Sequence, residues 1–271
     1  MANLQVGAHS DIVRTMAAAP IRQVILACAT GFLYPLCFPD FDLGQLAWVL
    51  LLPLHLALDG VTRRRAFWLG WLAGVIAFIG TMFWVVVAMH DYGHMPVGLS
   101  YALMVLLATY LGLYLALYAV ALTWLRRSLP FFAFFGAPFI WVTLELIRTY
   151  LLSGLPWDLL GYSQYLWLPV IQIADHTGVY GVSFIIVLVN AALAEVVVWS
   201  LHRLRDHLGT SLPVERFSWL SPAAAMLIMT YTLAYGDVIL KSGVPPDGNR
   251  SLTVGVVQAN IDQARKWDAA Y

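Results

Sequence analysis

The sequence has little charge. Only 11% of its 271 residues are Asp, Glu, Lys or Arg, whereas 61% are hydrophobic. Soluble domains carry roughly 25% charged residues, so this composition excludes an ordinary water-soluble protein. The formal net charge is zero, which argues against nucleic acid as a partner because no basic excess is present to neutralise phosphates. The composition instead indicates an all-α polytopic membrane protein, rich in the Trp and Tyr residues typical of membrane interfaces.

Cysteine is also scarce, with only Cys28 and Cys37, and nothing supports a disulfide between them. We interpret both as small, buried apolar residues. The sequence lacks a Gly-rich phosphate loop, a nucleophile elbow and a metal-binding cluster, so we predict no cofactor and find no complete catalytic constellation. No apolar run precedes the small residues near the N-terminus, and we therefore expect an uncleaved signal anchor rather than a cleaved signal peptide.

Long apolar segments are plentiful. A transmembrane helix needs about 20 apolar residues. On this criterion we predict about seven transmembrane helices, at residues 20–36, 43–58, 66–89, 96–125, 131–152, 179–201 and 218–239. The first two are short and share one loop, which predicts a tight hairpin.

Basic residues alternate between the loops of this count. With the N-terminus on the cytoplasmic side, the inner segments hold ten of the fifteen basic residues, and the outer loops hold no Lys or Arg. Cytoplasmic loops are enriched in Lys and Arg, so this pattern predicts a cytoplasmic N-terminus. With seven spans, the residues after Leu240 then lie on the opposite face. The acidic residues of the outer loops are Asp40, Asp42, Asp91, Asp158 and Asp175.

The C-terminal residues differ from the membrane part. We assign residues 1–240 to a transmembrane domain and the polar, Pro/Gly-containing residues 241–250 to a linker. Residues 251–271 open with a short β-branched run that predicts the first strand of a water-facing domain. A lone strand leaves its backbone groups unpaired, so we expect this segment to be loosely ordered or to borrow contacts from the membrane part.

Two charged residues lie within an otherwise apolar helix. Glu145 and Arg148 are three positions apart and therefore share one face. An isolated charge at the centre of a membrane helix costs roughly 2.5–3.5 kcal/mol, so an unpaired arrangement is disfavoured. Two interpretations stay open: a structural ion pair that pins the helix to its neighbours, or a polar floor beneath an external site with Arg148 in reach of a lipid phosphate.

The segment that follows, "SGLPWDLLGYSQ", combines helix breakers with interfacial aromatics, including Trp157 and Tyr162. We expect irregular backbone that lies along or dips into the outer leaflet. Such backbone survives at membrane depth only where protein or water satisfies it. Gln164, Ser163 and Asp158 could bind a lipid headgroup, and the favoured alternative is that they satisfy this backbone.

The order and spacing of four segments resemble the bacterial apolipoprotein N-acyltransferase family. They are "GFLYPLCFPDFDLGQLAWVLLLPL", "WVTLELIRTYLLSGLPWDLLGYSQ", "QIADHTGVYGVSFIIVLVNAAL" and "LTVGVVQANIDQARKW". The resemblance implies an inner-membrane enzyme with an extracytoplasmic αββα nitrilase-like domain. It implies transfer of an acyl chain from a phospholipid, through a Cys thioester, to the α-amino group of a diacylglyceryl-cysteine at the N-terminus of a lipoprotein.

The resemblance also implies that the catalytic Glu, Lys and Cys would lie beyond Tyr271, so we expect this chain alone to be inactive. It places Trp267 near the acyl-binding cleft, with packing of the domain onto the membrane as the alternative. The predicted substrate-binding residues are Glu145, Arg148, Trp157, Tyr162, Gln164 and Trp267. Two other functions stay open: a membrane transporter, although no internal repeat supports one, and a non-catalytic scaffold that binds lipid or lipoprotein.

Overall fold

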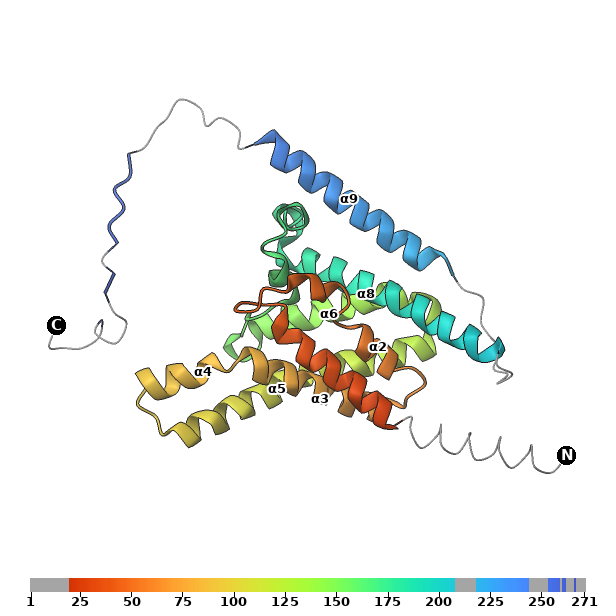
Figure 1. Ribbon diagram of the computed structural model, residues 1–271, viewed down its shortest axis with the longest axis horizontal. Helices are drawn as coiled ribbons and strands as arrows, with labels where there is room; N and C mark the ends of the chain where they lie inside the picture. Colours follow the sequence, from red (N-terminus) through yellow and green to blue (C-terminus); the bar gives the residue numbers. More distant parts are fainter. Residues whose placement is uncertain (1–19, 208–217, 244–252, 259, 262–265, 267–271) are drawn as a thin grey trace.

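The computed structural model describes residues 20–207, 218–243, 253–258, 260–261 and 266. These residues form a helical bundle, with no strand among them (Figure 1). A first helix covers residues 20–36. The other long helices are α3 (Arg63–Thr81), α5 (Val97–Ser128), α6 (Ala133–Tyr150), α8 (Ala174–His207) and α9 (Leu220–Ser242). The short elements are η1 (Gly44–Trp48), α2 (Leu52–Ala57), α4 (Trp84–Val87), η2 (Ala88–Tyr92), η3 (Pro130–Phe132), η4 (Leu151–Ser153), η5 (Leu160–Gln164) and α7 (Leu168–Ile171).

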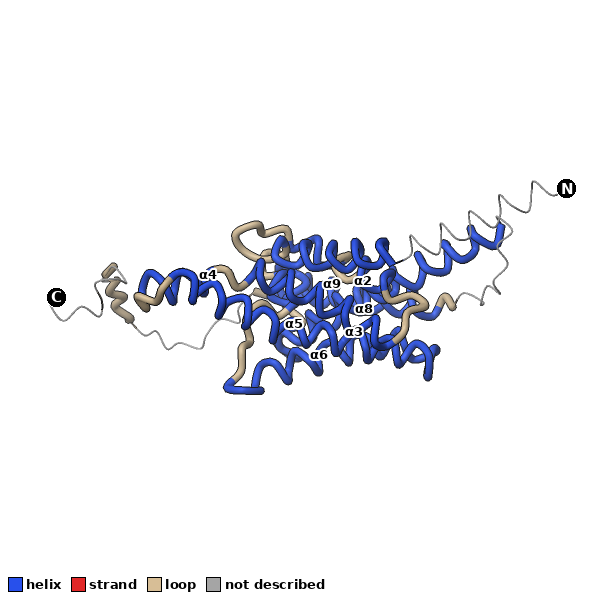
Figure 2. The backbone as a smooth tube through the Cα atoms, turned by 90° about the horizontal axis from the view of Figure 1, so that it is seen from below, coloured by secondary structure: helices blue, strands red, loops and turns tan. Residues whose placement is uncertain are grey.

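The predicted all-α membrane architecture is confirmed, but the count of spans changes. Within the described residues, α5, α6 with η3, α8 and α9 are each long and apolar enough to cross a membrane. A fifth span results if α3 and the α4–η2 segment, which meet at a bend of 50°, are counted as one. Figure 2 shows the hairpin of α4 and α5 extending beyond the rest of the bundle. Helices suit this setting because they satisfy their own backbone hydrogen bonds.

The predicted span at 43–58 is wrong as a single membrane-crossing helix. Residues Gly44–Ala57 form only a short apolar helical stretch, broken between η1 and α2. Asn190 of α8 bonds to the backbone at this break: its Oδ1 accepts from Leu51 N at 2.8 Å and its Nδ2 donates to Ala47 O at 2.9 Å. Pro53 lies in the first turn of α2, where a residue without a backbone N–H favours a new helix start. The buried amide of Asn190 satisfies backbone groups that the break leaves without helical partners.

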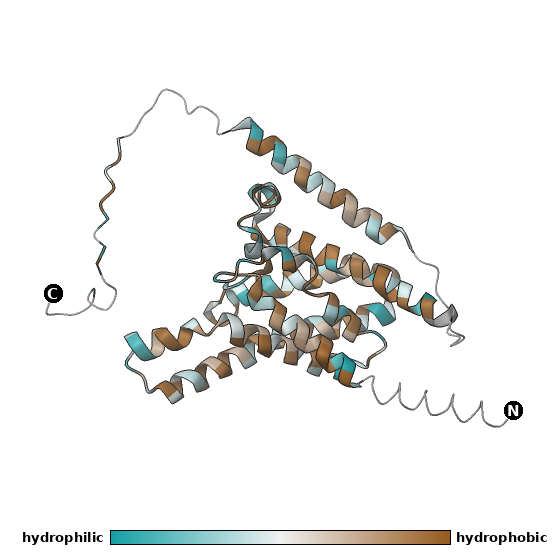
Figure 3. Cartoon of the chain, in the orientation of Figure 1, coloured by the Kyte–Doolittle hydropathy of each residue, from teal (hydrophilic) through white to brown (hydrophobic). Residues whose placement is uncertain are grey.

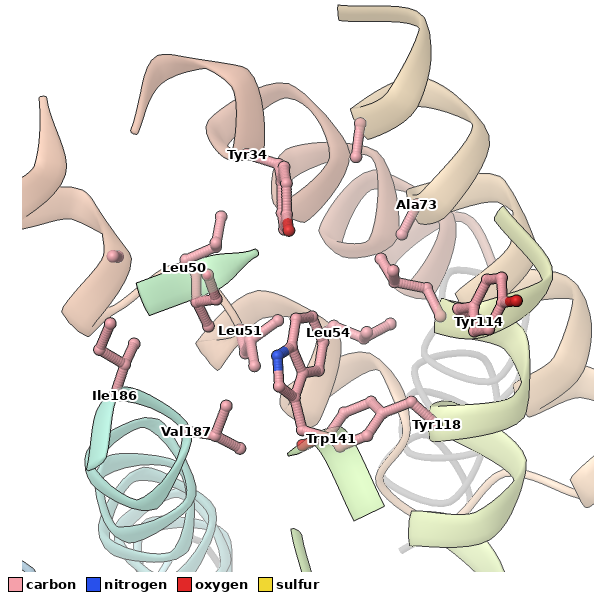
Figure 4. Packing of buried hydrophobic residues seen from close by; sticks show 14 of the residues in the cluster. Tyr34, Leu50, Leu51, Leu54, Ala73, Tyr114, Tyr118, Trp141, Ile186 and Val187 are labelled. Carbon is pink, nitrogen blue, oxygen red and sulfur yellow. The ribbon is translucent and has the colours of Figure 1, made fainter. Parts of the chain in front are cut away.

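The broken segment forms the centre of the hydrophobic core. Leu50, Leu51 and Leu54 are fully buried. Figure 4 shows them between the helices that carry Trp141 and Ile186. Because these side chains face protein on every side, an apolar run that resembles a lipid-facing span in the sequence is here a core element.

The loops of the bundle gather at two ends. At the arginine end, Arg127 Nη2 donates to Val61 O at 2.6 Å and His202 bonds to Asp59 at 3.2 Å. At the opposite, loop end, Tyr165 OH donates to Asp42 Oδ1 at 2.6 Å. We define the arginine end by residues 59–65, Arg126, Arg127 and His202, and the loop end by Asp42, Trp84, residues 154–167 and Asp175.

Residues 43–58 therefore return the chain from the loop end to the arginine end, although no single helix does so. Asp42 and Tyr165, from two loops predicted on the outer side, are in contact, and so are Asp59 and His202, from two segments predicted on the inner side. In Figure 3, hydrophobic colour dominates along the helices, and hydrophilic colour is clear at the tip of the α4–η2 segment and at the start of the helix at 20–36.

The predicted strand does not appear among the described C-terminal residues. Residues 253–258 carry no helix or strand, and Val256 and Val257 are 89% and 92% exposed. The physical reason is that a strand needs a partner for its backbone groups, and no described segment pairs with this one. Leu252, where the strand was predicted to begin, lies outside the described residues, as do residues 244–250 of the predicted linker.

Candidate functional site

The segment after α6 leaves the helix abruptly and folds back onto the bundle. Gly154 has φ +79°, a conformation that residues with a Cβ rarely adopt, and an added Cβ would lie 1.9 Å from Thr149 O. Leu155 N then donates to Arg148 O at 2.9 Å. The backbone continues without regular structure to the 3₁₀ turn η5. The irregular backbone predicted for this segment is therefore confirmed.

Glu145 and Arg148 hold this segment rather than each other. Glu145 Oε1 accepts a hydrogen bond from Leu160 N at 2.7 Å. Arg148 Nη2 donates to Asp158 O at 3.3 Å, and its guanidinium lies 5.1 Å from the centroid of the Phe78 ring. Neither the ion pairs nor the hydrogen bonds of the described residues join Glu145 to Arg148, so the structure does not contain the ion pair that the spacing allowed.

Both charged side chains are buried, at 4% and 5% exposure for Glu145 and Arg148. At this burial Arg148 does not reach the surface, where a lipid phosphate would lie. Tyr34 of the first helix adds a further bond to the same loop, since its hydroxyl donates to Asp158 O at 2.8 Å. Side chains of the first helix and of α6 thus hold the backbone at Asp158, and α6 also holds it at Leu160.

Gln164 joins the segment to the broken stretch at 43–58. Its Nε2 donates to Gly44 O at 2.7 Å and to Ser163 Oγ at 2.8 Å, and its Oε1 accepts from Trp48 Nε1 at 3.0 Å. The side chain is 2% exposed. Because its polar atoms already bond to protein groups, the geometry favours the interpretation in which Gln164 satisfies irregular backbone.

The outer surface of the segment is aromatic. Trp157 and Tyr162 are 48% and 46% exposed, and the Trp157 ring lies 4.9 Å from that of Trp84. Trp167 packs edge-on against Trp48 at 5.6 Å. Aromatic side chains with a polar edge suit the boundary between lipid and water. A surface pocket of about 220 Å³ opens beside them, lined by Asp42, Gly44, Gln45, Ser163, Gln164, Leu166 and Trp167.

Asp158 is the electrostatically unusual group of the loop. Its φ of 51° is rare for a residue with a side chain, and its Oδ2 is buried without a hydrogen-bond partner among the described residues. Burial raises the pKa of Asp158 to about 6, against the opposing influence of Thr81 and Arg148. A carboxylate held in this way gains protons at mildly acidic pH.

A small cavity lies beneath the loop, lined by Tyr34, Tyr114, Trp141, Glu145 and Arg148 among others. Its volume of about 20 Å³ has room for one water molecule. Glu145 Oε2 is buried and has no hydrogen-bond partner within the part of the chain that the structure describes. A single water could satisfy this oxygen, but the cavity is far too small for an acyl chain.

The predicted site residues therefore fall into two groups. Trp157 and Tyr162 form the exposed surface, whereas Glu145, Arg148 and Gln164 lie behind it and hold the backbone. Trp267 lies outside the described residues. Across the described residues no group of three or more His, Cys, Asp or Glu side chains is placed to hold a metal ion.

Two supporting residues were missed from the sequence. Gly161 N donates to Ser183 Oγ at 2.8 Å, which ties η5 to α8. Gly44 lies so close to the segment that an added Cβ would be 2.1 Å from Ser163 O. Ser183 falls within the "GVYGVS" motif, which was the available signal, whereas Gly44 had no signal besides its place in the hairpin loop.

Comparisons with known proteins identify the family. The family model described as "Apolipoprotein N-acyltransferase N-terminal domain" matches residues 30–192. Proteins named apolipoprotein N-acyltransferase are similar over most of the chain: one from Geobacter metallireducens is 36% identical over 94% of this chain and 46% of its own length. Relatives from Pseudomonas paraeruginosa and Photobacterium profundum are 35% and 30% identical, over 90% and 91% of this chain and 45% and 44% of their own lengths. The chain thus spans about half the length of the curated relatives it matches.

Proposed function

The chain belongs to the apolipoprotein N-acyltransferase family, and from this premise we propose that it is the membrane portion of an enzyme that acylates lipoproteins. The enzyme transfers an acyl chain from a phospholipid to the α-amino group of the diacylglyceryl-cysteine at a lipoprotein's N-terminus. The observation that carries the proposal is the family match across residues 30–192, which includes all of residues 154–167.

The chemistry we propose is acyl transfer in two steps: a Cys thiolate takes the acyl chain as a thioester and releases a lysophospholipid, and the α-amino group then takes the chain and releases the thiol. A thiolate is a strong nucleophile once a base or a nearby cation activates it, and a covalent intermediate divides one difficult transfer into two easier ones. The nucleophilic Cys, its Glu base and a Lys that stabilises the oxyanion would lie beyond Tyr271, in a nitrilase-like domain. We place the start of that domain at residues 251–271, after a transmembrane domain at 1–240 and a linker at 241–250.

The membrane portion supplies the place where the two substrates meet. Neither the phospholipid donor nor the lipid-bearing acceptor leaves the membrane, so the reaction has to occur at its surface. We propose that the loop end faces the periplasm of a bacterial inner membrane and the arginine end faces the cytoplasm. The concentration of Arg side chains at one end and of acidic and aromatic side chains at the other supports this orientation.

We further propose a division of labour among the predicted site residues. Trp157 and Tyr162 contact the lipid portions of the substrates, because they are the most exposed aromatic side chains of residues 154–167. Glu145, Arg148 and Gln164 are positioning residues, which act through the backbone that they bond. Trp267 contributes to the acyl-binding cleft.

A chimera tests the proposed function. This chain would be joined to the remaining half of the Geobacter metallireducens relative and expressed in cells depleted of their own apolipoprotein N-acyltransferase. We expect mass spectrometry of a lipoprotein's N-terminal peptide to show the added acyl chain. The relative's remaining half, expressed alone, serves as the control and should leave the amino group free. A chimera that inserts stably and does not acylate, while the intact relative does, would contradict the proposal.

The same chimera tests the exposed aromatic residues. Trp157→Ala and Tyr162→Ala should each lower kcat/KM for the phospholipid donor about tenfold, because each removes an aromatic contact with lipid. Their thermal unfolding should hardly change, since both side chains are half exposed. Trp219→Ala is the matched control: Trp219 is 73% exposed and lies directly before Leu220, the first residue of α9. Equal loss of activity in the Trp219 variant would contradict the assignment of Trp157 and Tyr162 as lipid contacts.

A further inference from the structure

A second pocket lies at the arginine end, far from the loop segment. It occupies about 440 Å³ between the first helix and the start of α3, and its lining residues are Val24, Thr62, Arg64, Arg65, Trp68, Leu69 and Leu72. This volume falls within the range of sites that bind small molecules, roughly 300–1,000 Å³. Nothing in the acyl transfer proposed above uses it.

The pocket is amphipathic along its length. Arg65, Trp68, Leu69 and Leu72 follow the spacing i, i+3, i+4 and i+7 and therefore lie on one face of α3. The charged residues come first, at the helix start, and the apolar ones follow toward the interior of the bundle. Trp68 lies between them and is 55% exposed, as expected of a side chain at the membrane boundary.

The arginines of this pocket are free to bind a ligand. At the same end, Arg126 Nη1 donates to His55 O at 3.0 Å and Arg127 Nη2 donates to Val61 O at 2.6 Å, so these two guanidinium groups are already engaged. The hydrogen bonds and ion pairs of the described residues include none from the side chains of Arg64 and Arg65.

No acidic residue lines the pocket either. The acid that lies nearby in the sequence, Asp59, bonds to His202 at 3.2 Å. A zwitterionic headgroup would bring an ammonium group into a pocket with two guanidinium groups and no carboxylate. An anionic headgroup would meet complementary charge.

We propose that this pocket binds one anionic phospholipid, with its phosphate against Arg64 and Arg65 and the start of an acyl chain along Trp68, Leu69 and Leu72. The lipid fixes the first helix to α3, because Val24 of the one and Leu69 of the other line the same pocket. This site is separate from acyl transfer, and the lipid in it is bound rather than consumed.

Lipid titration with matched variants tests the proposal. The purified protein in detergent would be titrated with dioleoyl phosphatidylglycerol or dioleoyl phosphatidylcholine, and retained lipid would be counted by native mass spectrometry. We expect a clear preference for phosphatidylglycerol. The double variant R64Q/R65Q should weaken its binding by about 10- to 30-fold, as the loss of two basic contacts implies.

The control is R22Q/R63Q, which removes the same charge from the same end without changing a residue that lines the pocket. It should weaken phosphatidylglycerol binding less than about threefold. Equal losses in the two double variants would mean general attraction to a basic surface and would overturn the proposal. Equal binding of phosphatidylcholine and phosphatidylglycerol by the unaltered protein would overturn it as well.

The apolar half of the pocket has its own variant. Leu72→Trp enlarges a lining side chain and leaves every charge in place, so we expect phosphatidylglycerol binding to weaken although the surface charge is unchanged. Inorganic phosphate at millimolar concentration should leave the bound lipid in place. Full displacement by phosphate, or unaltered lipid binding in the Leu72 variant, would show that the pocket holds a free anion rather than a lipid.

Discussion

The two ends of the bundle use polar residues in opposite ways. At the loop end the polar side chains turn inward: Glu145, Arg148 and Gln164 are buried and bond to the backbone of the segment that they support. At the arginine end Arg64 and Arg65 line a surface pocket, and their guanidinium groups bond to no described residue. The same bundle therefore carries one end whose polar groups fix its shape and one end whose polar groups are available to a ligand.

This difference predicts where substitutions affect stability and where they affect binding. A buried hydrogen bond that is lost leaves its partner unsatisfied, at a cost of about 1–3 kcal/mol for each group. A surface residue away from such features changes stability by about 0.5 kcal/mol or less. Substitutions that remove the buried bonds of Glu145 and Gln164 should therefore lower stability, and those of Arg64 and Arg65 should lower lipid affinity alone.

The largest effect is expected at Gln164. Gln164→Leu leaves Gly44 O and Trp48 Nε1 without their partner, and we expect a loss of about 3 kcal/mol in the free energy of unfolding. Thermal or denaturant unfolding in detergent measures it. Gln45→Leu is the matched control, because Gln45 lines the same surface pocket but is exposed. Similar stability for the two variants would show that the buried bonds of Gln164 do not stabilise the loop end.

A somewhat smaller effect is expected at Glu145. Glu145→Ala removes the acceptor of Leu160 N, and a lost hydrogen bond to a charged group costs about 2 kcal/mol. Glu145→Gln keeps an oxygen at the same place and should retain most of the stability. If Ala and Gln prove equally destabilising, the bond to Leu160 is not what Glu145 contributes.

Asp158 should make stability depend on pH. Burial raises its pKa from 3.8 to about 6, so the folded state disfavours the charged form. Its contribution is therefore most favourable below about pH 4, is lost as the pH rises through about 6, and is constant above that. The shift of roughly two pKa units corresponds to about 3 kcal/mol at most.

Asp158→Asn removes this dependence and tests it. We expect the variant to be more stable than the unaltered protein at pH 7, and to lose that advantage as the pH is lowered to 4. Thermal unfolding at four pH values between 4 and 7 measures the difference. Parallel curves for the two proteins would show that Asp158 is not the titrating group.

The smallest effect on stability is expected at the arginine end. R64Q/R65Q should change the free energy of unfolding in lipid-free detergent by no more than about 0.5 kcal/mol per residue, because neither guanidinium bonds to a described residue. The same measurement with phosphatidylglycerol present should show less stabilisation by lipid than in the unaltered protein. A large loss without lipid would mean that these arginines hold the fold, as the buried groups do at the other end.

Composition was sufficient to predict the helical membrane architecture, and loop charges assigned Asp59 and His202 to one side and Asp42 and Tyr165 to the other, in line with their contacts. They depend on local properties: the length of an apolar run, and the sign of the charge that follows it. The irregular segment after α6 was predictable for the same reason, since Gly154 and Pro156 disfavour helix wherever they occur.

Contacts between distant residues were not predictable from one sequence. Pro53 favours a helix start within 43–58, but the side chain that satisfies the broken backbone, Asn190, lies 139 residues beyond Leu51. Glu145 and Arg148 have the spacing of an ion pair, but both side chains form hydrogen bonds with the backbone of residues 158 and 160 instead. Such choices depend on which buried groups need a partner in the folded chain, and spacing along one helix does not reveal that.

The central claim is that the two ends of the bundle face opposite sides of the membrane, with residues 154–167 outside. Labelling of intact cells with a membrane-impermeant maleimide tests it on Tyr162→Cys and Arg63→Cys, both at exposed positions, with the unaltered protein as the background for Cys28 and Cys37. We predict that the cysteine at 162 reacts in intact cells and that the cysteine at 63 reacts only after lysis. Reaction of the cysteine at 63 in intact cells, or protection of the cysteine at 162, would contradict the account.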